Sequence, residues 1–106
     1  MARIIDLEFN DKTYSIEYNR ESVIKVMANR KENDDVIDIA INLIECGLLK
    51  HHKEEMPNRD DVVAWLLALG EDLPKFVEAL QDSVQEVLEV IQSEQKSKNL
   101  KWGVRK

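Results

Sequence analysis

The segment from residue 34 to residue 50 limits the fold more than any other part of the sequence. Its apolar side chains fall nearly all round the axis of a helix, so a helix here cannot lie on a surface. Asn33, Asp34 and Asp35 suit its N-terminus, and Gly47 marks either its end or a close contact. We predict a buried central helix over 34–50. Its apolar residues are Val36, Ile37, Ile39, Ala40, Ile41, Leu43, Ile44, Cys46, Leu48 and Leu49.

The first part of the chain has the period of two β-strands. From residue 3 to residue 9, apolar side chains alternate with polar or charged ones, as in a strand that is buried on one face. A polar turn at residues 10–12 separates this run from a second alternating run. The pattern predicts a β-hairpin over residues 3–18. Its inward-facing apolar residues are Ile5, Leu7, Phe9, Tyr14, Ile16 and Tyr18.

The chain up to residue 95 predicts three further helices, over about 20–31, 59–70 and 73–95. Apolar side chains recur at helical spacing in each of them and are expected to face the core. The last helix is long and amphipathic, so we expect it to close the core. The apolar residues of the three helices are Val23, Val26, Met27, Val62, Val63, Trp65, Leu66, Leu67, Leu69, Leu73, Phe76, Val77, Leu80, Val84, Val87, Leu88 and Ile91.

Capping residues indicate where these helices begin and end. Asn19, Asn58 and Asp72 are the expected N-caps, and Gly70 is expected to stop the helix before it in a left-handed conformation. A hairpin followed by about four helices is an α+β fold that is mainly helical, and 106 residues suffice for one core. We expect residues 1–95 to form a single domain and residues 96–106 to form a flexible basic tail.

Charge is distributed unevenly between these two parts. Residues 1–95 hold all 21 acidic side chains and 10 of the 15 Lys and Arg, while residues 96–106 hold the other five cations. An acidic body repels phosphate backbones, so nucleic acid binding is disfavoured. No apolar run approaches the length of a membrane span. The single cysteine, Cys46, forms no internal disulfide, which fits a protein of the cytoplasm.

No group of residues has the spacing that catalysis, a metal ion or a phosphate requires. His51 and His52 are adjacent and diverge in direction, so a solvated helix end explains them better than a metal site. Cys46 lies in the most apolar helix, where burial suppresses the thiolate. The three glycines are scattered, which argues against a phosphate-binding loop. We therefore expect a binding protein rather than an enzyme, without a cofactor.

The tail carries the candidate partner-binding residues. Trp102 is a large aromatic side chain on a segment that has no core of its own, so some other surface should bury it. Either the tail folds back on its own domain, or it docks on a partner as a strand or hook. The sequence favours neither alternative. The candidate residues are Leu100, Lys101, Trp102, Val104 and Arg105.

The order of several motifs resembles that of one family. The opening of the chain reads Leu-Glu-Phe-Asn-Asp-Lys-Thr-Tyr-Ser-Ile-Glu-Tyr-Asn-Arg-Glu-Ser-Val over residues 7–23. An apolar helix then ends in Gly-Leu-Leu-Lys-His-His at 47–52, and a Pro-Asn-Arg-Asp-Asp helix start follows at 57–61. With the long last helix and the basic aromatic tail, this order resembles the small tail assembly chaperones of long-tailed, siphovirus-type phages and prophages of Gram-positive bacteria.

The resemblance implies a non-enzymatic chaperone that binds the tape measure protein, keeps its long apolar helices in solution and assists the recruitment of tail tube subunits. It also implies action in the cytoplasm of the bacterial host and absence from the mature virion. Unused apolar faces would allow a homo-oligomer. Two other classes stay open: a structural head–tail connector or minor tail component of the virion, and a small regulatory adaptor that uses its basic tail.

Overall fold

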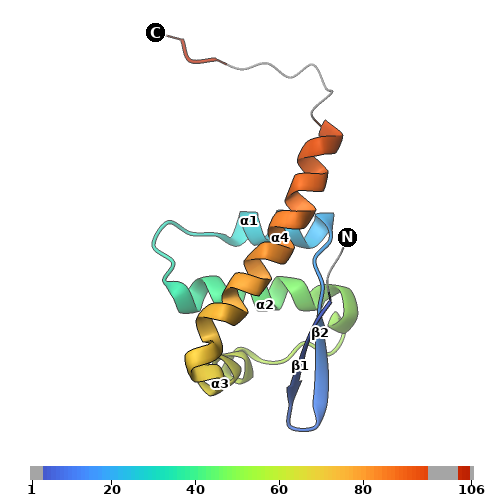
Figure 1. Cartoon of the computed structure of the whole chain (residues 1–106), viewed down its shortest axis with the longest axis vertical. Helices are drawn as coiled ribbons and strands as arrows, with labels where there is room; N and C mark the ends of the chain where they lie inside the picture. Colours follow the sequence, from blue (N-terminus) through green and yellow to red (C-terminus); the bar gives the residue numbers. More distant parts are fainter. Residues whose placement is uncertain (1–3, 96–102, 106) are drawn as a thin grey trace.

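The computed structural model describes residues 4–95 and 103–105. An antiparallel hairpin comes first and helices follow, so the predicted α+β fold, mainly helical, is confirmed (Figure 1). The elements are β1 (Ile5–Phe9), β2 (Lys12–Ile16), α1 (Arg20–Asn29), α2 (Val36–His52), α3 (Arg59–Leu69), the short 3-10 helix η1 (Gly70–Asp72) and α4 (Leu73–Gln95).

The hairpin closes on a two-residue turn. Asn10 and Asp11 have φ angles of 51° and 63°, the left-handed pair of a type I′ turn. Lys12 is already the first residue of β2 and pairs with Phe9, so the predicted turn is one residue too long. The predicted alternation is confirmed. The inward-facing side chains are buried on β2 (Tyr14 and Ile16) and half-buried on β1 (Ile5, Leu7 and Phe9).

Helix α2 is the buried centre of the fold, as predicted. It follows the N-cap Asp35 and ends at His52, so it begins and ends two residues later than expected. The strand β2 and the helices α1, α3 and α4 all pack against it. The buried residues of α2 are Ala40, Ile41, Leu43, Ile44, Cys46, Gly47 and Leu48.

Gly47 lies inside α2 at the point where the chain after β2 crosses the helix. Its carbonyl oxygen accepts a hydrogen bond from the backbone N–H of Glu17 at 3.0 Å. One turn earlier, the carbonyl of Leu43 accepts from the Tyr18 hydroxyl at 2.6 Å. A Cβ atom at position 47 would lie 2.4 Å from Cγ2 of Ile16. Of the two alternatives for this glycine, the close contact is confirmed and the helix end is wrong.

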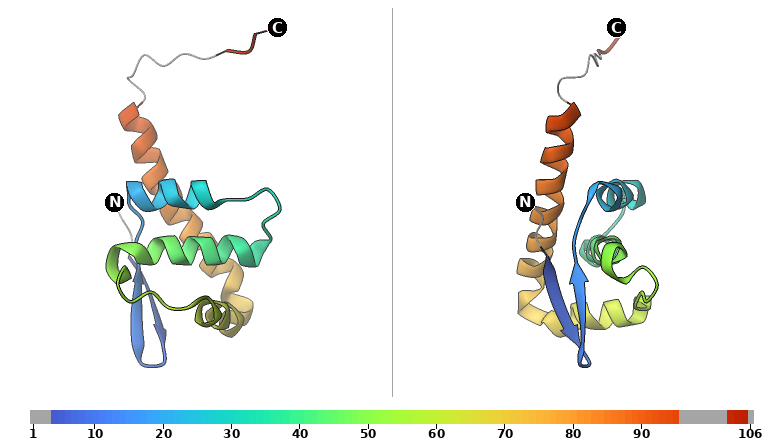
Figure 2. Two further views of the ribbon diagram at one scale, coloured as in Figure 1. Left: turned by 180° about the vertical axis from the view of Figure 1, so that it is seen from behind. Right: turned by 90° about the vertical axis from the view of Figure 1, so that its right-hand side faces the viewer.

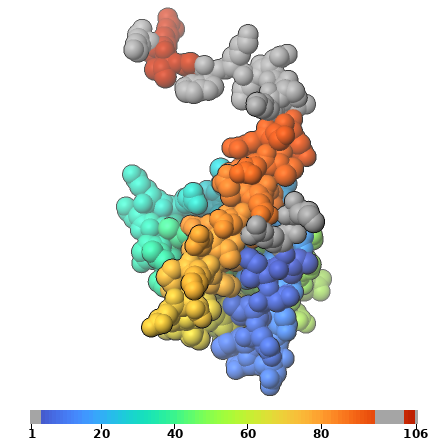
Figure 3. Space-filling model, viewed as in Figure 1, coloured from blue at the N-terminus to red at the C-terminus, as the bar shows by residue number. Residues whose placement is uncertain are grey.

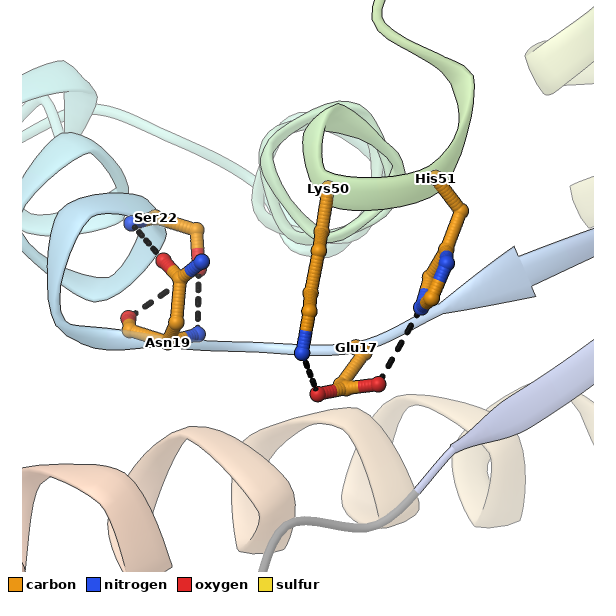
Figure 4. Close-up of polar contacts among 5 residues, drawn as sticks. All are labelled: Glu17, Asn19, Ser22, Lys50 and His51. Carbon is orange, nitrogen blue, oxygen red and sulfur yellow. Dashed lines mark hydrogen bonds and ion pairs between the residues drawn. The ribbon is translucent and has the colours of Figure 1, made fainter.

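Helix α1 begins at Asn19, as predicted. The side chain of Asn19 accepts from the N–H of Ser22 at 2.9 Å, and Ser22 Oγ accepts from the N–H of Asn19 at 2.8 Å (Figure 4). This reciprocal capping box satisfies two N–H groups that the helix leaves free. Val23 and Val26 are buried, but Met27 is 55% exposed. The prediction that Met27 faces the core is wrong, because Ser22, Val23 and Val26 fill the inner side of this short helix.

Helices α3 and α4 follow each other without a loop. Asn58 caps α3 by accepting from the N–H of Asp61 at 2.8 Å, as predicted. Gly70 has the predicted positive φ, 54°, but the chain continues through η1 into α4. Asp72 therefore lies inside η1 and is not an N-cap, because an N-cap needs an extended backbone. Leu67 is 73% exposed, against the prediction that it faces the core.

Helix α4 is the longest element, with 23 residues and a length of about 34 Å at 1.5 Å per residue. It packs against α1 and α2, and its last turns extend beyond the rest of the domain (Figure 2). Val77 and Leu80 are buried in the core, so the predicted closing role is confirmed. None of the helices within residues 4–95 is long and apolar enough to cross a membrane.

Candidate functional site

The tail residues predicted to bind a partner lie largely outside the described part of the chain. Leu100, Lys101 and Trp102 are outside it. Val104 and Arg105 belong to the described segment 103–105 and are exposed, Val104 to 78%. Figure 1 shows this segment beyond the end of α4, away from the hairpin. The two described candidate residues therefore lie on the surface.

The apolar stripe of α4 loses its cover toward the C-terminal end of the helix. Leu80, in the middle of α4, is fully buried. Val87 and Ile91, two and three turns later, are half-buried, and Val90 beside them is 53% exposed. We call Val87, Val90 and Ile91 the distal α4 surface. It is a partly exposed apolar surface on a helix whose last turns project from the domain.

Helix α1, which packs against α4, also exposes apolar side chains. Ile24 is 54% exposed and Met27 is 55% exposed, and a separation of three residues places both on one side of the helix. Sequence periodicity predicts Met27 as a core residue, so this apolar side of α1 is a finding of the structure. The two neighbouring helices α1 and α4 thus both present apolar groups to solvent.

A charged cluster lies where the chain after β2 passes the last turn of α2. Glu17 is 7% exposed, and its two carboxylate oxygens bind two basic side chains of α2 (Figure 4). One oxygen accepts from Lys50 Nζ, and the other lies 3.1 Å from His51 Nε2. These hydrogen bonds, first that of Lys50 and then that of His51, lower the pKa of the Glu17 carboxyl. The cluster ties the hairpin to α2.

His52 has a different structural role. Its Nε2 accepts a hydrogen bond from the backbone N–H of Ser15 at 2.9 Å, and its ring centroid lies 5.4 Å from that of Tyr14. The prediction of a solvated helix end agrees with His51, which is exposed, but is wrong for His52, because the hairpin lies against that side chain. No group of three potential metal ligands occurs within residues 4–95 and 103–105.

Cys46 is a buried residue of α2, as predicted. It is 2% exposed, and its thiol lies 3.3 Å from Asn42 Oδ1 as a weak donor. Burial raises the pKa of the thiol above its ordinary value. Cys46 thus packs as a small apolar group, and this environment disfavours the reactive thiolate.

An open depression of about 510 Å³ lies between the α1–α2 connection and the start of α3. Three of the charged residues that line it, Asp34, Asp38 and Arg59, have local partners. Asp34 accepts from the backbone N–H of Lys31 at 2.9 Å, and Asp38 lies 4.0 Å from Arg59. Two basic and three acidic side chains line the depression, so charge of neither sign dominates it.

Comparison with known families connects this fold to one of them. A family model described as a domain of unknown function (DUF5055) matches residues 1–105. The chain belongs to the DUF5055 family. Comparison with curated proteins finds no match, and comparison with solved structures finds none. Because the match runs from the hairpin into the tail, the family model spans both the domain and the candidate residues up to Arg105.

The sequence patterns do not predict the Glu17 cluster of this DUF5055 chain. Glu17 falls between Ile16 and Tyr18, on the polar side of the alternating run, where an exposed side chain is expected. The side chains that bind it, Lys50 and His51, are 33 and 34 residues away. One signal does exist: Lys50 and His51 form part of an unusual cationic run at the end of the most apolar helix.

Proposed function

We propose that this chain is a non-enzymatic tail assembly chaperone of a long-tailed phage or prophage. In this role it binds helical segments of the tape measure protein in the host cytoplasm, assists the recruitment of tail tube subunits and leaves before the virion is complete. The observation that supports this most is the distal α4 surface, where Val90 is 53% exposed and the stripe around it is only half-buried.

An amphipathic helix with an uncovered stripe is suited to a helical client. Two helices pack by interlocking the side chains that recur every three or four residues, and Val87, Val90 and Ile91 have that spacing. A long apolar client helix would cover them and would in turn be shielded from other copies of itself. The surface thus fits the client that the family resemblance implies.

The charge of the domain supports the same role. Residues 1–95 carry 21 acidic side chains against 10 Lys and Arg, and net charge of one sign keeps protein complexes dispersed. Acidic residues also follow the polar side of α4, beside the proposed client surface. They include the exposed Glu78, Asp82, Glu89 and Glu94.

The test is co-expression with the product of the adjacent long, helix-rich gene, followed by affinity capture and by measurement of the soluble client fraction. Val90→Lys should reduce both capture and solubility, because it places a charge on the distal α4 surface. Val36→Lys is the matched control, since Val36 is 61% exposed at the start of α2. Circular dichroism should show that both variants are folded.

Two outcomes would contradict the proposal. Failure of the wild-type chain to capture or solubilise the client would reject the chaperone role. Equal capture by Val90→Lys and Val36→Lys would reject the distal α4 surface as the contact. Recovery of the chain from purified virions would instead support a structural connector or minor tail component.

A further inference from the structure

The two edges of the hairpin differ in whether their backbone groups have partners. At the outer edge of β2, the N–H of Ser15 donates to His52 Nε2 at 2.9 Å. Just beyond the strand, the N–H of Glu17 donates to the carbonyl of Gly47 at 3.0 Å. The end of α2 therefore covers this edge over these residues. Covering an edge in this way prevents pairing with another chain.

Among residues 4–95 and 103–105, no element covers the outer edge of β1 in this way. The two-residue turn makes Phe9↔Lys12 the closing hydrogen-bonded pair. Pairs then alternate along the ladder, so the backbone groups of Asp6 and Glu8 point away from β2. The outward N–H of Ser15, the partner of Asp6, agrees with this register. Within the described residues, the backbone of β1 makes no hydrogen bond outside the hairpin.

The apolar side chains of β1 are also less buried than those of β2. On the face of the sheet toward the core, Tyr14 and Ile16 of β2 are 8% and 0% exposed. The corresponding residues of β1, Ile5, Leu7 and Phe9, are only half-buried. The space-filling view shows β1 at the surface beside α4 (Figure 3). A third strand would satisfy the outward backbone groups and cover these apolar side chains.

The chain itself contains a segment with the matching pattern. Residues 100–105 read Leu-Lys-Trp-Gly-Val-Arg, with apolar side chains at 100, 102 and 104 and cations at 101 and 105. In β1 the apolar residues alternate with the exposed acids Asp6 and Glu8. Paired strands would thus place apolar side chains on one face and opposite charges on the other. Opposite charges that face each other across two strands stabilise their pairing.

We propose that the free edge of β1 binds residues 100–105 from the tail of a second copy of this chain, as a third strand. The described part of the tail, residues 103–105, lies beyond the end of α4 and away from the hairpin of its own chain (Figures 1 and 2). Residues 103–105 therefore lie away from the β1 edge of their own chain. This inference does not depend on the chaperone role.

Such a contact has a defined symmetry consequence. The donor segment and the acceptor edge are different surfaces, so each molecule uses one of each. Copies joined in this way form a ring when the rotation between them closes, and an open chain when it does not. Two copies that exchange tails form a closed dimer. In each case, a molecule that has lost its donor tail and a molecule that has lost its acceptor edge can still form one contact. The tail of the second molecule then binds the β1 edge of the first.

Sedimentation velocity of the full chain over a range of concentrations tests the proposal. We expect the wild-type chain to self-associate. The donor variant Lys101→Glu/Arg105→Glu and the acceptor variant Asp6→Lys/Glu8→Lys should each raise the dissociation constant about tenfold or more, a change of about 1.4 kcal/mol. An equal mixture of the two variants should form a one-to-one heterodimer, because the native tail of the acceptor variant meets the native edge of the donor variant and the two reversed sets of charges attract each other. Charge repulsion within either variant alone cannot explain that heterodimer.

A second pair of variants tests the backbone contact. Glu8→Pro removes an outward N–H of β1, while Thr13→Pro makes the same change at the partner residue on the outer side of β2. Association should be lost in Glu8→Pro and kept in Thr13→Pro, with circular dichroism as the check on folding. A wild-type chain that is monomeric at every concentration would overturn the proposal. So would variants that associate like the wild type, or a mixture that stays monomeric.

Discussion

Replacing Gly47 with Ala should destabilise this protein, although the same change usually stabilises a helix. Inside a helix Ala is favoured over Gly by about 1 kcal/mol. At position 47, however, the new carbon would lie 2.4 Å from Ile16 Cγ2 and 2.9 Å from Tyr18 Cζ. Neither atom is the free end of a flexible side chain, and Ile16 is fully buried. The backbone after β2 must therefore move away from α2.

The size of the effect follows from what this movement disturbs. Overpacking a close-packed core costs about 1–3 kcal/mol. The movement also lengthens the hydrogen bonds from Glu17 to Gly47 and from Tyr18 to Leu43, each of which contributes about 1 kcal/mol. After the gain in helix propensity is subtracted, we expect a loss of about 2 kcal/mol. In a domain of this size that loss lowers Tm by about 8–16 °C.

Thermal and urea unfolding followed by circular dichroism measure this change, and a second substitution tests its cause. Ile16→Leu removes the Cγ2 branch that the new carbon meets. In the Ile16→Leu background, Gly47→Ala should therefore cost less, with a coupling free energy of at least about 0.5 kcal/mol. A Tm that rises in Gly47→Ala would refute the steric argument. Strictly additive effects in the double variant would show that Ile16 is not the obstacle.

Three further changes test single contacts. Glu17→Gln should lower the free energy of unfolding by about 1.5–3 kcal/mol at neutral pH. The folded pKa of Glu17 lies below the ordinary value of 4.5. The difference in the free energy of unfolding between wild type and variant is therefore complete above pH 4.5, and it disappears as the pH falls through the folded pKa. Urea unfolding at several pH values measures this difference. Burial raises the pKa of Tyr18. In an alkaline titration, the phenolate absorbance of Tyr18 should therefore appear only at the pH at which the protein unfolds, and its appearance at a lower pH would contradict the burial of this residue. Asn58→Ala should cost about 1 kcal/mol by loss of the α3 cap, and an unchanged midpoint in urea would show that the hydrogen bond to Asp61 contributes nothing.

Local patterns in the sequence predict most of the elements of this fold. The alternation around Leu7 and Tyr14, the caps Asn19 and Asn58 and the positive φ of Gly70 each depend on residues that are neighbours in the chain. Such interactions act within a few residues and leave a visible spacing. The type and order of the elements could therefore be predicted from the sequence.

Contacts between distant segments could not be predicted from the sequence. Glu17 is expected on a polar strand face, and only the path of the chain across the end of α2 brings Lys50 to it. Met27 and Leu67 fit a helical stripe, yet both are exposed because no other described element packs over them. The uncovered edge of β1 likewise depends on which elements pack beside the hairpin, and strand periodicity does not contain that information.

The direct passage from α3 into α4 has a mechanical consequence. Gly70 has φ 54° and ψ −118°, a backbone conformation that residues with a side chain adopt only with strain. Beyond it lies a rigid arm of about 34 Å, held against the domain by α1 and α2. A rotation of about 10° at the base of such an arm displaces its tip by about 6 Å. The conformation of Gly70, together with the packing on α1 and α2, thus sets the direction in which the apolar end of α4 points.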